Sequence, residues 1–307
     1  MRCGGTSPPC VSSKPASAHE RYLAHLRNER RLSGHTVAAY ARDITALRDL
    51  AAGRGVADLT THDIRRFVAT LHGRGLSPRS LARLLSSWRG YFGWLARHRE
   101  VDANPCHGVR APRAPRHLPE TLSPDDAVRL VAHVDDSETG VRDRALFELA
   151  YSCGLRVSEL TGLDLDSIDA TTGEARVTGK GAKTRIVPVG APALEAVARW
   201  LLLRAGRARP GEKALFVGRS GKRLTPREVQ KRIKLRAAAA GLNVDVHPHM
   251  LRHSFASHVL QSSGDLRAVQ EMLGHASIAS TQVYTHLDFQ HLAKVYDAAH
   301  PRAKRRK

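Results

Sequence analysis

The sequence predicts a mainly α-helical protein with two domains, and three observations lead to this class. Its 307 residues exceed the size of one small domain. Apolar residues recur at helical spacing through residues 18–98 and through much of residues 120–300. Only residues 163–190 show the alternating, β-branched pattern of strands. We expect an N-terminal four-helix domain and a C-terminal, mostly α domain with a small antiparallel three-stranded sheet.

The N-terminal domain is expected over residues 18–101, after a disordered extension at residues 1–17 that is rich in Gly, Ser and Pro. Ser33, Thr60 and Ser77 stand where helices should begin, and their side chains suit the N-cap position. Short turns between the helices predict a compact bundle. The four helices are expected at about 19–31, 34–52, 61–74 and 77–98.

Four prolines between residues 102 and 119 predict a stiff interdomain linker. A second domain is expected over residues 120–300, followed by a basic tail at 301–307. Strands are expected at 163–169, 174–179 and 185–190. Helices are expected at about 123–134, 141–154, 155–160, 191–206, 225–241, 251–264, 266–275 and 289–299.

A net charge of +20 is the strongest bulk signal. Residues 1–115 hold 19 basic and 8 acidic side chains, and residues 116–307 hold 30 and 21. Because both halves are basic, the distribution favours a two-domain clamp around a polyanion over a basic tail on a neutral body. Charge alone fits equally well a protein that binds RNA or ribosomes without chemistry.

The four cysteines and the apolar segments indicate the compartment. The cysteines show no C-x-x-C spacing, residues 1–18 lack a continuous apolar run, and no stretch approaches the ~18 apolar residues of a membrane span. We therefore expect a cytoplasmic protein without structural disulfides. Cys153, in the apolar stretch ALFELAYSCGL, is expected in the core.

Six residues of the second half form a candidate site for phosphate chemistry. Arginine can grip a phosphate through two parallel hydrogen bonds, and a phenol can attack one when cationic neighbours lower its pKa from about 10. His249 and Arg252 stand at i and i+3, on one helical face. The site comprises Arg156, Lys180, His249, Arg252, His275 and Tyr284.

Each of these residues also has an ordinary interpretation. His249 and His253 have the i, i+4 spacing of a zinc site, but a metalloprotease helix needs Glu after the first His, where this chain has Met250. We therefore expect no metal and no cofactor, with His253 structural or facing solvent. Tyr296 is the rival phenol, and its apolar helix face favours core packing. Lys180 and Lys183 lie on a hairpin tip that is either a solvated turn or a finger reaching the reacting phosphate.

These motifs resemble the tyrosine recombinases, the phage-integrase family. GLRVSEL, GKGAKTRIVPVG, HPHMLRHSFASHVL and LGHASIASTQVYTH follow the family's order and spacing, and the resemblance extends from about His19 to the end of the chain. The helical module with GHTVAAYARDI resembles the core-binding (SAM-like) domain of the family's Xer branch. The ending DFQHLAKVYDAAHPRAK resembles one of the two partner recombinases of that branch.

The resemblance implies a catalytic fold and a role for each residue. Tyr284 would attack the scissile phosphate and form a 3′-phosphotyrosyl link, while Arg156 and Arg252 stabilise the transition state. His275 would donate a hydrogen bond to a phosphate oxygen, and His249 would assist proton transfer. Lys180 matches the general acid for the leaving 5′-oxygen, with Lys183 as the alternative. Strand exchange would then need neither metal nor ATP.

The resemblance also implies partners. The partners are double-stranded DNA at a dif-like site and a second Xer-branch recombinase. The two recombinases would form a heterotetramer with two copies of each protein. This complex would resolve chromosome dimers during chromosome segregation and cell division. The helix after Tyr284 would pack into a neighbouring subunit, with burial in its own domain as the alternative. The other functions considered are a phage or transposon integrase of the same family and a DNA-binding architectural protein without catalysis.

Overall fold

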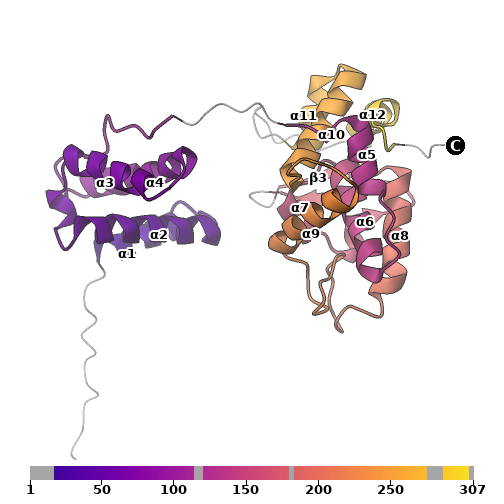
Figure 1. The fold of residues 1–307 in the computed structure, drawn as a ribbon, viewed down its shortest axis with the longest axis horizontal. Helices are drawn as coiled ribbons and strands as arrows, with labels where there is room; N and C mark the ends of the chain where they lie inside the picture. The colour runs from indigo at the N-terminus through magenta and orange to yellow at the C-terminus, as the bar shows by residue number, and fades with distance from the viewer. Residues whose placement is uncertain (1–16, 114–119, 180–182, 275–285, 304–307) are drawn as a thin grey trace, which may run out of the picture. The chain divides into compact units, whose positions relative to one another are not determined.

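The computed structural model describes residues 17–113, 120–179, 183–274 and 286–303, with the side chains of the last stretch described from residue 292 on. The chain forms two compact units, Met1–Arg116 and His117–Lys307 (Figure 1). The expected extension at residues 1–17 lies outside the described part except for Ser17.

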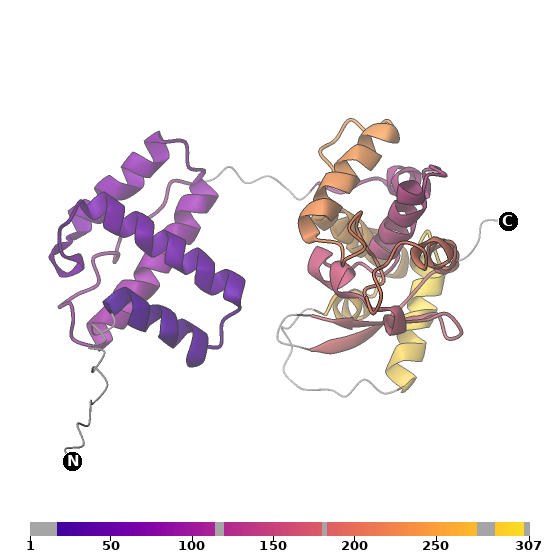
Figure 2. The ribbon, with the colours of Figure 1, turned by 90° about the horizontal axis from the view of Figure 1, so that it is seen from below.

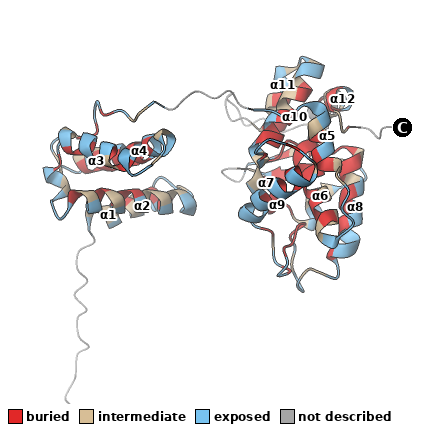
Figure 3. Cartoon of the chain, viewed as in Figure 1, coloured by how far each residue is buried: buried red, intermediate tan, exposed pale blue. Residues whose placement is uncertain are grey.

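Four helices build the described part of the N-terminal unit, as the periodicity predicts: α1 (Ala18–Asn28), α2 (Gly34–Ala51), α3 (Thr61–Gly73) and α4 (Pro78–Arg97). A 3-10 turn, η1 (Val56–Asp58), precedes α3. The hydroxyls of Ser33, Thr60 and Ser77 each accept a hydrogen bond from the third backbone N–H of their helix, which confirms the predicted caps. The inner faces of the helices form one hydrophobic core around Trp88 and Phe92 of α4 (Figure 3).

The first half of the predicted linker belongs to this unit instead of bridging the two. Cys106 and Val109 are buried in its hydrophobic core. Arg89 of α4 donates a hydrogen bond to the Val109 carbonyl at 3.0 Å, and the Asn104 side chain donates one to the Arg89 carbonyl at 3.0 Å. Two apolar side chains therefore fold this proline-containing segment back onto α4, and residues 114–119 lie outside the described part.

The C-terminal unit is built around one helix, α6 (Glu138–Ser152), most of whose residues are buried. Helices α5 (Pro124–Ala132), α8 (Ala191–Arg204) and α10 (Pro248–Ser263) pack against it (Figure 3). The unit is completed by α7 (Val157–Gly162), α9 (Pro226–Ala239), α11 (Leu266–Leu273) and α12 (His286–Ala299). None of the helices within the described ranges is long and apolar enough to cross a bilayer.

A small antiparallel sheet of order β1-β2-β3 confirms the predicted three strands, β1 (Ile168–Asp169), β2 (Glu174–Thr178) and β3 (Thr184–Pro188). The first strand is shorter than predicted because Leu165–Ser167 form a 3-10 turn, η2. Its entry is fixed by the Ser167 hydroxyl, which accepts a hydrogen bond from the Asp164 N–H at 2.9 Å. The Ser167 side chain thus favours a turn over continued alternation.

The C-terminal helix α12 packs beside α10 and β3 of its own unit (Figure 2). Leu292 and Tyr296 are buried there, and Val295 packs on the same core. The described side chains of this helix therefore take the alternative expectation, burial within their own domain. The predicted basic tail also starts inside the fold, because Arg302 forms an ion pair with buried Glu148 and Ala303 is buried.

Candidate active site

Arg156 is placed by a tight turn between α6 and α7. Gly154 in that turn has a φ of 58°, and a Cβ there would lie 2.5 Å from the ring of Phe255 on α10. Only glycine allows this backbone conformation together with so close an approach. The turn thereby fixes the position of Arg156, whose side chain is 37% exposed and accessible to a ligand.

Arg252 lies near the start of α10, with its guanidinium buried against two backbone carbonyls. Nη1 donates a hydrogen bond to the Gly154 carbonyl and Nη2 donates one to the Leu273 carbonyl, each at 2.6 Å. A guanidinium has five N–H donors, so these two bonds fix its plane and leave others for a ligand. Burial, and then the charge of Arg156, lower the pKa of Arg252 to about 10, so it remains cationic at neutral pH.

Glu159 of α7 lies between these two arginines, and its side chain is only 1% exposed. Its carboxylate accepts hydrogen bonds from the backbone N–H and from Nη1 of Arg156, both at 2.8 Å, and lies 3.8 Å from Nη1 of Arg252. Burial opposes its ionisation, but hydrogen bonds from Arg185 and Arg156 outweigh burial and lower the pKa of Glu159 to about 2. At neutral pH this anion holds Arg156 by hydrogen bonds and lies close to Arg252, so the two guanidinium groups lie near each other.

A third arginine, Arg185 of β3, completes the cluster. Its Nη1 and Nη2 donate to the two oxygens of Glu159 at 2.9 and 3.0 Å, and its Nε donates to the Met272 carbonyl at 2.9 Å. Three guanidinium groups against one carboxylate leave two positive charges. This arrangement can bind an anion with two accessible oxygens, such as a phosphodiester.

His249 lies on the exposed side of the start of α10, as its predicted place on the helix requires. Burial lowers its pKa first, and the nearby His253 and Arg252 lower it further. Its imidazole is therefore neutral at neutral pH and can accept a proton. The ring of His253 stacks on that of His249 with centroids 6.0 Å apart, and His253 is exposed, the second of the two positions expected for it.

Of the remaining predicted residues, some are described by the structure and others lie outside the described part. Lys183 is exposed just before β3, where its carbonyl accepts a hydrogen bond from the Gly179 N–H at 2.8 Å. Tyr296 is buried and its hydroxyl pairs with the Ser152 hydroxyl at 2.5 Å, which confirms its core role. Cys153 is also buried, as predicted. Lys180, His275 and Tyr284 lie outside the described residues.

Sequence reasoning missed Glu159 and Arg185, although a signal for each is present. Period-2 alternation in β3 puts Arg185 on the same face as Val187, and both are buried. An arginine on the core face of a strand requires an acidic partner. Glu159 stands three residues after Arg156, the capping-box spacing that turns its carboxylate back toward the helix start.

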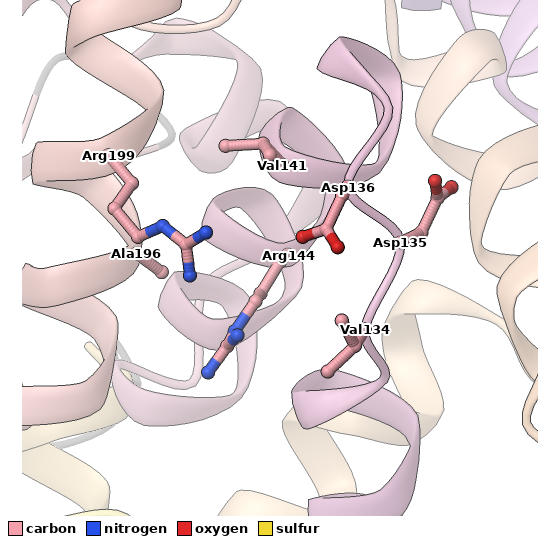
Figure 4. Close-up of a pocket in the computed structure, with 7 residues that line it drawn as sticks. All are labelled: Val134, Asp135, Asp136, Val141, Arg144, Ala196 and Arg199. Carbon is pink, nitrogen blue, oxygen red and sulfur yellow. The ribbon is translucent and has the colours of Figure 1, made fainter.

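Two other kinds of site were considered. Among the described residues, no group of three or more His, Cys, Asp or Glu side chains is placed to hold a metal ion. Figure 4 shows a pocket between α6, α8 and the turn after α5, lined by Arg144, Arg199 and Asp136 among others. Its cavity of about 10 Å³ has room for about one water molecule, too little for a small-molecule substrate.

Comparison with known protein families covers both units. Residues 120–291 match the Phage integrase family, and residues 19–99 match the family described as Phage integrase, N-terminal SAM-like domain. Tyrosine recombinase XerC 1 of Ralstonia nicotianae is 55% identical over 98% of this chain and 99% of its own length. Tyrosine recombinase XerC of Pseudomonas aeruginosa is 54% identical over 94% of this chain and 95% of its own.

Solved structures show the same fold. The XerH site-specific recombinase bound to palindromic difH substrate, a post-cleavage complex, has a TM-score of 0.69 at 24% identity and covers 92% of this chain and 84% of its own. A lambda integrase (75–356) dimer bound to a COC′ core site has a TM-score of 0.69 at 19% identity, with 87% and 98% covered.

Proposed function

Because this chain belongs to the phage integrase family of tyrosine recombinases, we propose that the arginine cluster binds a scissile DNA phosphate for attack by Tyr284. The family makes it a site-specific recombinase that transfers DNA strands. The resemblance inferred from the sequence motifs is thereby confirmed, including the XerC type of its closing segment. The observation that carries the proposal is the buried Glu159 carboxylate, which is hydrogen-bonded by Arg156 and lies 3.8 Å from Arg252, so that the two guanidinium groups lie close together.

The proposed reaction is a transesterification. The Tyr284 hydroxyl oxygen forms a bond to phosphorus while the bond from phosphorus to the 5′-oxygen breaks, and the DNA strand remains attached through a 3′-phosphotyrosyl ester. The tyrosine proton leaves through His249, and the 5′-oxygen takes a proton from Lys180, or from Lys183 as the alternative. The second transesterification reverses these steps with the 5′-hydroxyl of another strand. Each ester bond that breaks is replaced by another, so strand exchange requires no external energy source.

Arg156 and Arg252 would stabilise the charge that develops on the non-bridging oxygens. The hydrogen bonds of Arg252 to the Gly154 and Leu273 carbonyls fix its plane before DNA binds. Preorganised donors of this kind stabilise a transition state without a reorganisation cost during the reaction. His275 would add one hydrogen bond to the same phosphate. The lowered pKa of His249 keeps its ring neutral and suited to accept a proton.

We further propose that this recombinase acts in the cytoplasm at dif-like sites together with a XerD-type partner, as a heterotetramer with two copies of each, and resolves chromosome dimers during chromosome segregation and cell division. The support is the XerC name of its near-full-length relatives. A net charge of +20 divided between both halves of the chain fits a clamp on duplex DNA.

A nicked duplex carrying a dif-like site tests the catalytic proposal. After cleavage near the nick, a short fragment diffuses away and the covalent adduct accumulates, so it can be seen as a band that survives denaturing electrophoresis. Wild type should form the adduct, Tyr284→Phe should form none, and both should bind the duplex equally. Tyr296→Phe is the matched control and should keep the adduct. If wild type leaves no adduct, or Tyr284→Phe still forms one, the proposal fails.

A further inference from the structure

We propose that Arg185 is a positioning residue for DNA cleavage, which holds Glu159, and through it Arg156, in the geometry that grips the scissile phosphate. The inference rests on the proposed function above. It gives a role in the reaction to a residue that is outside the six-residue site and that does not contact DNA.

The hydrogen bonds of Arg185 commit every nitrogen of its guanidinium to the protein, whereas the two that Arg252 makes use only its Nη atoms. Arg185 is 6% exposed, and all three of its nitrogen atoms already donate hydrogen bonds within the protein. Its two Nη atoms form the paired bonds to Glu159 that only the planar guanidinium fork can make. Its effect on a phosphate must therefore pass through the groups that it holds.

Arg185 joins three elements of the site. It belongs to β3, its Nη atoms bind Glu159 of α7, and its Nε binds the Met272 carbonyl at the end of α11. The next carbonyl, Leu273, is bound by Arg252. Two consecutive carbonyls at a helix C-terminus, which lack partners inside the helix, are thus each held by a different arginine of the cluster.

The close packing around the Arg185–Glu159 ion pair leaves the two side chains little freedom to move. A Cβ on Gly274 would lie 3.0 Å from Cδ and 3.3 Å from Nε of Arg185, and a Cβ on Gly179 would lie 3.2 Å from an oxygen of Glu159. Two glycines therefore allow the backbone to close on the ion pair from two sides. The packing keeps the carboxylate in one orientation.

The orientation of Glu159 matters because its oxygens compete with the phosphate. Arg252 Nη1 lies 3.8 Å from the carboxylate, beyond hydrogen-bond distance, while both carboxylate oxygens are occupied by Arg185. Without Arg185, the buried carboxylate would take its hydrogen bonds from Arg156 and Arg252 alone. Both guanidinium groups would then turn toward Glu159 and away from the DNA.

The test separates binding from cleavage in the full-length protein on the nicked dif-like duplex. Arg185→Met should leave the equilibrium affinity for the duplex unchanged and lower the single-turnover rate of adduct formation at saturating protein by roughly 10²-fold, the effect of a catalytic group misplaced by about 1 Å. Arg185→Lys keeps one charged contact but not the fork, and should cleave at a rate between wild type and Arg185→Met.

Arg204→Met is the matched control. Arg204 is also 6% exposed, and its guanidinium donates to the Ala214 and Glu212 carbonyls, away from the site. Arg204→Met should lower the melting temperature as Arg185→Met does, and it should leave the cleavage rate at the wild-type value. The proposal is overturned if Arg185→Met cleaves as fast as Arg204→Met, or if it loses affinity in proportion to rate. If Arg185→Met does not fold, a wild-type rate for Arg185→Lys overturns it. Absence of adduct from wild type would instead refute the proposed function.

Discussion

Replacing Glu159 with glutamine should destabilise the C-terminal unit by an amount that can be worked from its contacts. The carboxylate is buried, is hydrogen-bonded by Arg156 and Arg185, and lies near Arg252. Lowering the pKa of Glu159 from 4.5 to about 2 corresponds to about 3 kcal/mol of stability at pH 7. Mutations that remove one partner of a buried ion pair cost about 3–5 kcal/mol, which agrees with the free energy obtained from the pKa shift.

The pH dependence of this loss follows from the sign of the pKa shift. Because the folded-state pKa of Glu159 lies below its unfolded value, the stabilisation is complete above pH 4.5 and is lost as the pH falls toward 2. Urea unfolding followed by circular dichroism should therefore show a difference between wild type and Glu159→Gln of about 3 kcal/mol at pH 7 and about 2 kcal/mol at pH 3.5.

The control for this experiment is Glu138→Gln, which removes an exposed carboxylate paired with Arg207. It should cost less than about 1 kcal/mol, and the cost should shrink in high salt. A loss below about 1 kcal/mol for Glu159→Gln at pH 7, or a loss that does not narrow in acid, would refute the reasoning that Glu159 anchors the arginine cluster.

Two further predictions concern α10. Protonation of His249 should slow cleavage as the pH falls below 6.5, because its pKa is lowered from that value, and the pH–rate profile should therefore show an acidic limb. His249→Gln should remove this limb. A limb that His249→Gln leaves unchanged would belong to another group. Ser254→Ala should cost about 1–3 kcal/mol in urea unfolding, because the buried Leu122 N–H donates its hydrogen bond to the Ser254 hydroxyl at 2.9 Å; wild-type stability would show that another acceptor replaces it.

Much of the fold follows from local patterns in the sequence. The helices of the N-terminal unit could be predicted because Ser33, Thr60 and Ser77 cap amphipathic segments, and these signals act within one turn. The segment around Cys106 could not, because its prolines indicate a stiff linker while its burial depends on contacts with α4 that are distant in sequence. The turn at Leu165–Ser167 was missed for a local reason, since Asp164 and Ser167 form a hydrogen-bonded turn where alternation predicts a strand.

The candidate site also combines residues that local sequence patterns predict with contacts that depend on the fold. The order and spacing of the motifs predicted Arg156, His249 and Arg252, and the structure brings these three side chains to one region. Local patterns mark Glu159 and Arg185 singly, but the two act on Arg156 through contacts that join α7, β3 and α11, which are distant in sequence. The amphipathic pattern of α12 left open which surface covers it, and the described side chains pack on their own unit.

The central claim is that Tyr284 is the residue to which DNA becomes attached. The most direct measurement is mass spectrometry of the trapped adduct after digestion of the protein with a protease and of the DNA with a nuclease. We predict one modified peptide, which spans Tyr284 and carries a nucleotide through a 3′-phosphate on the phenolic oxygen. Attachment to Tyr296, to a serine, or through a 5′-phosphate would contradict the account.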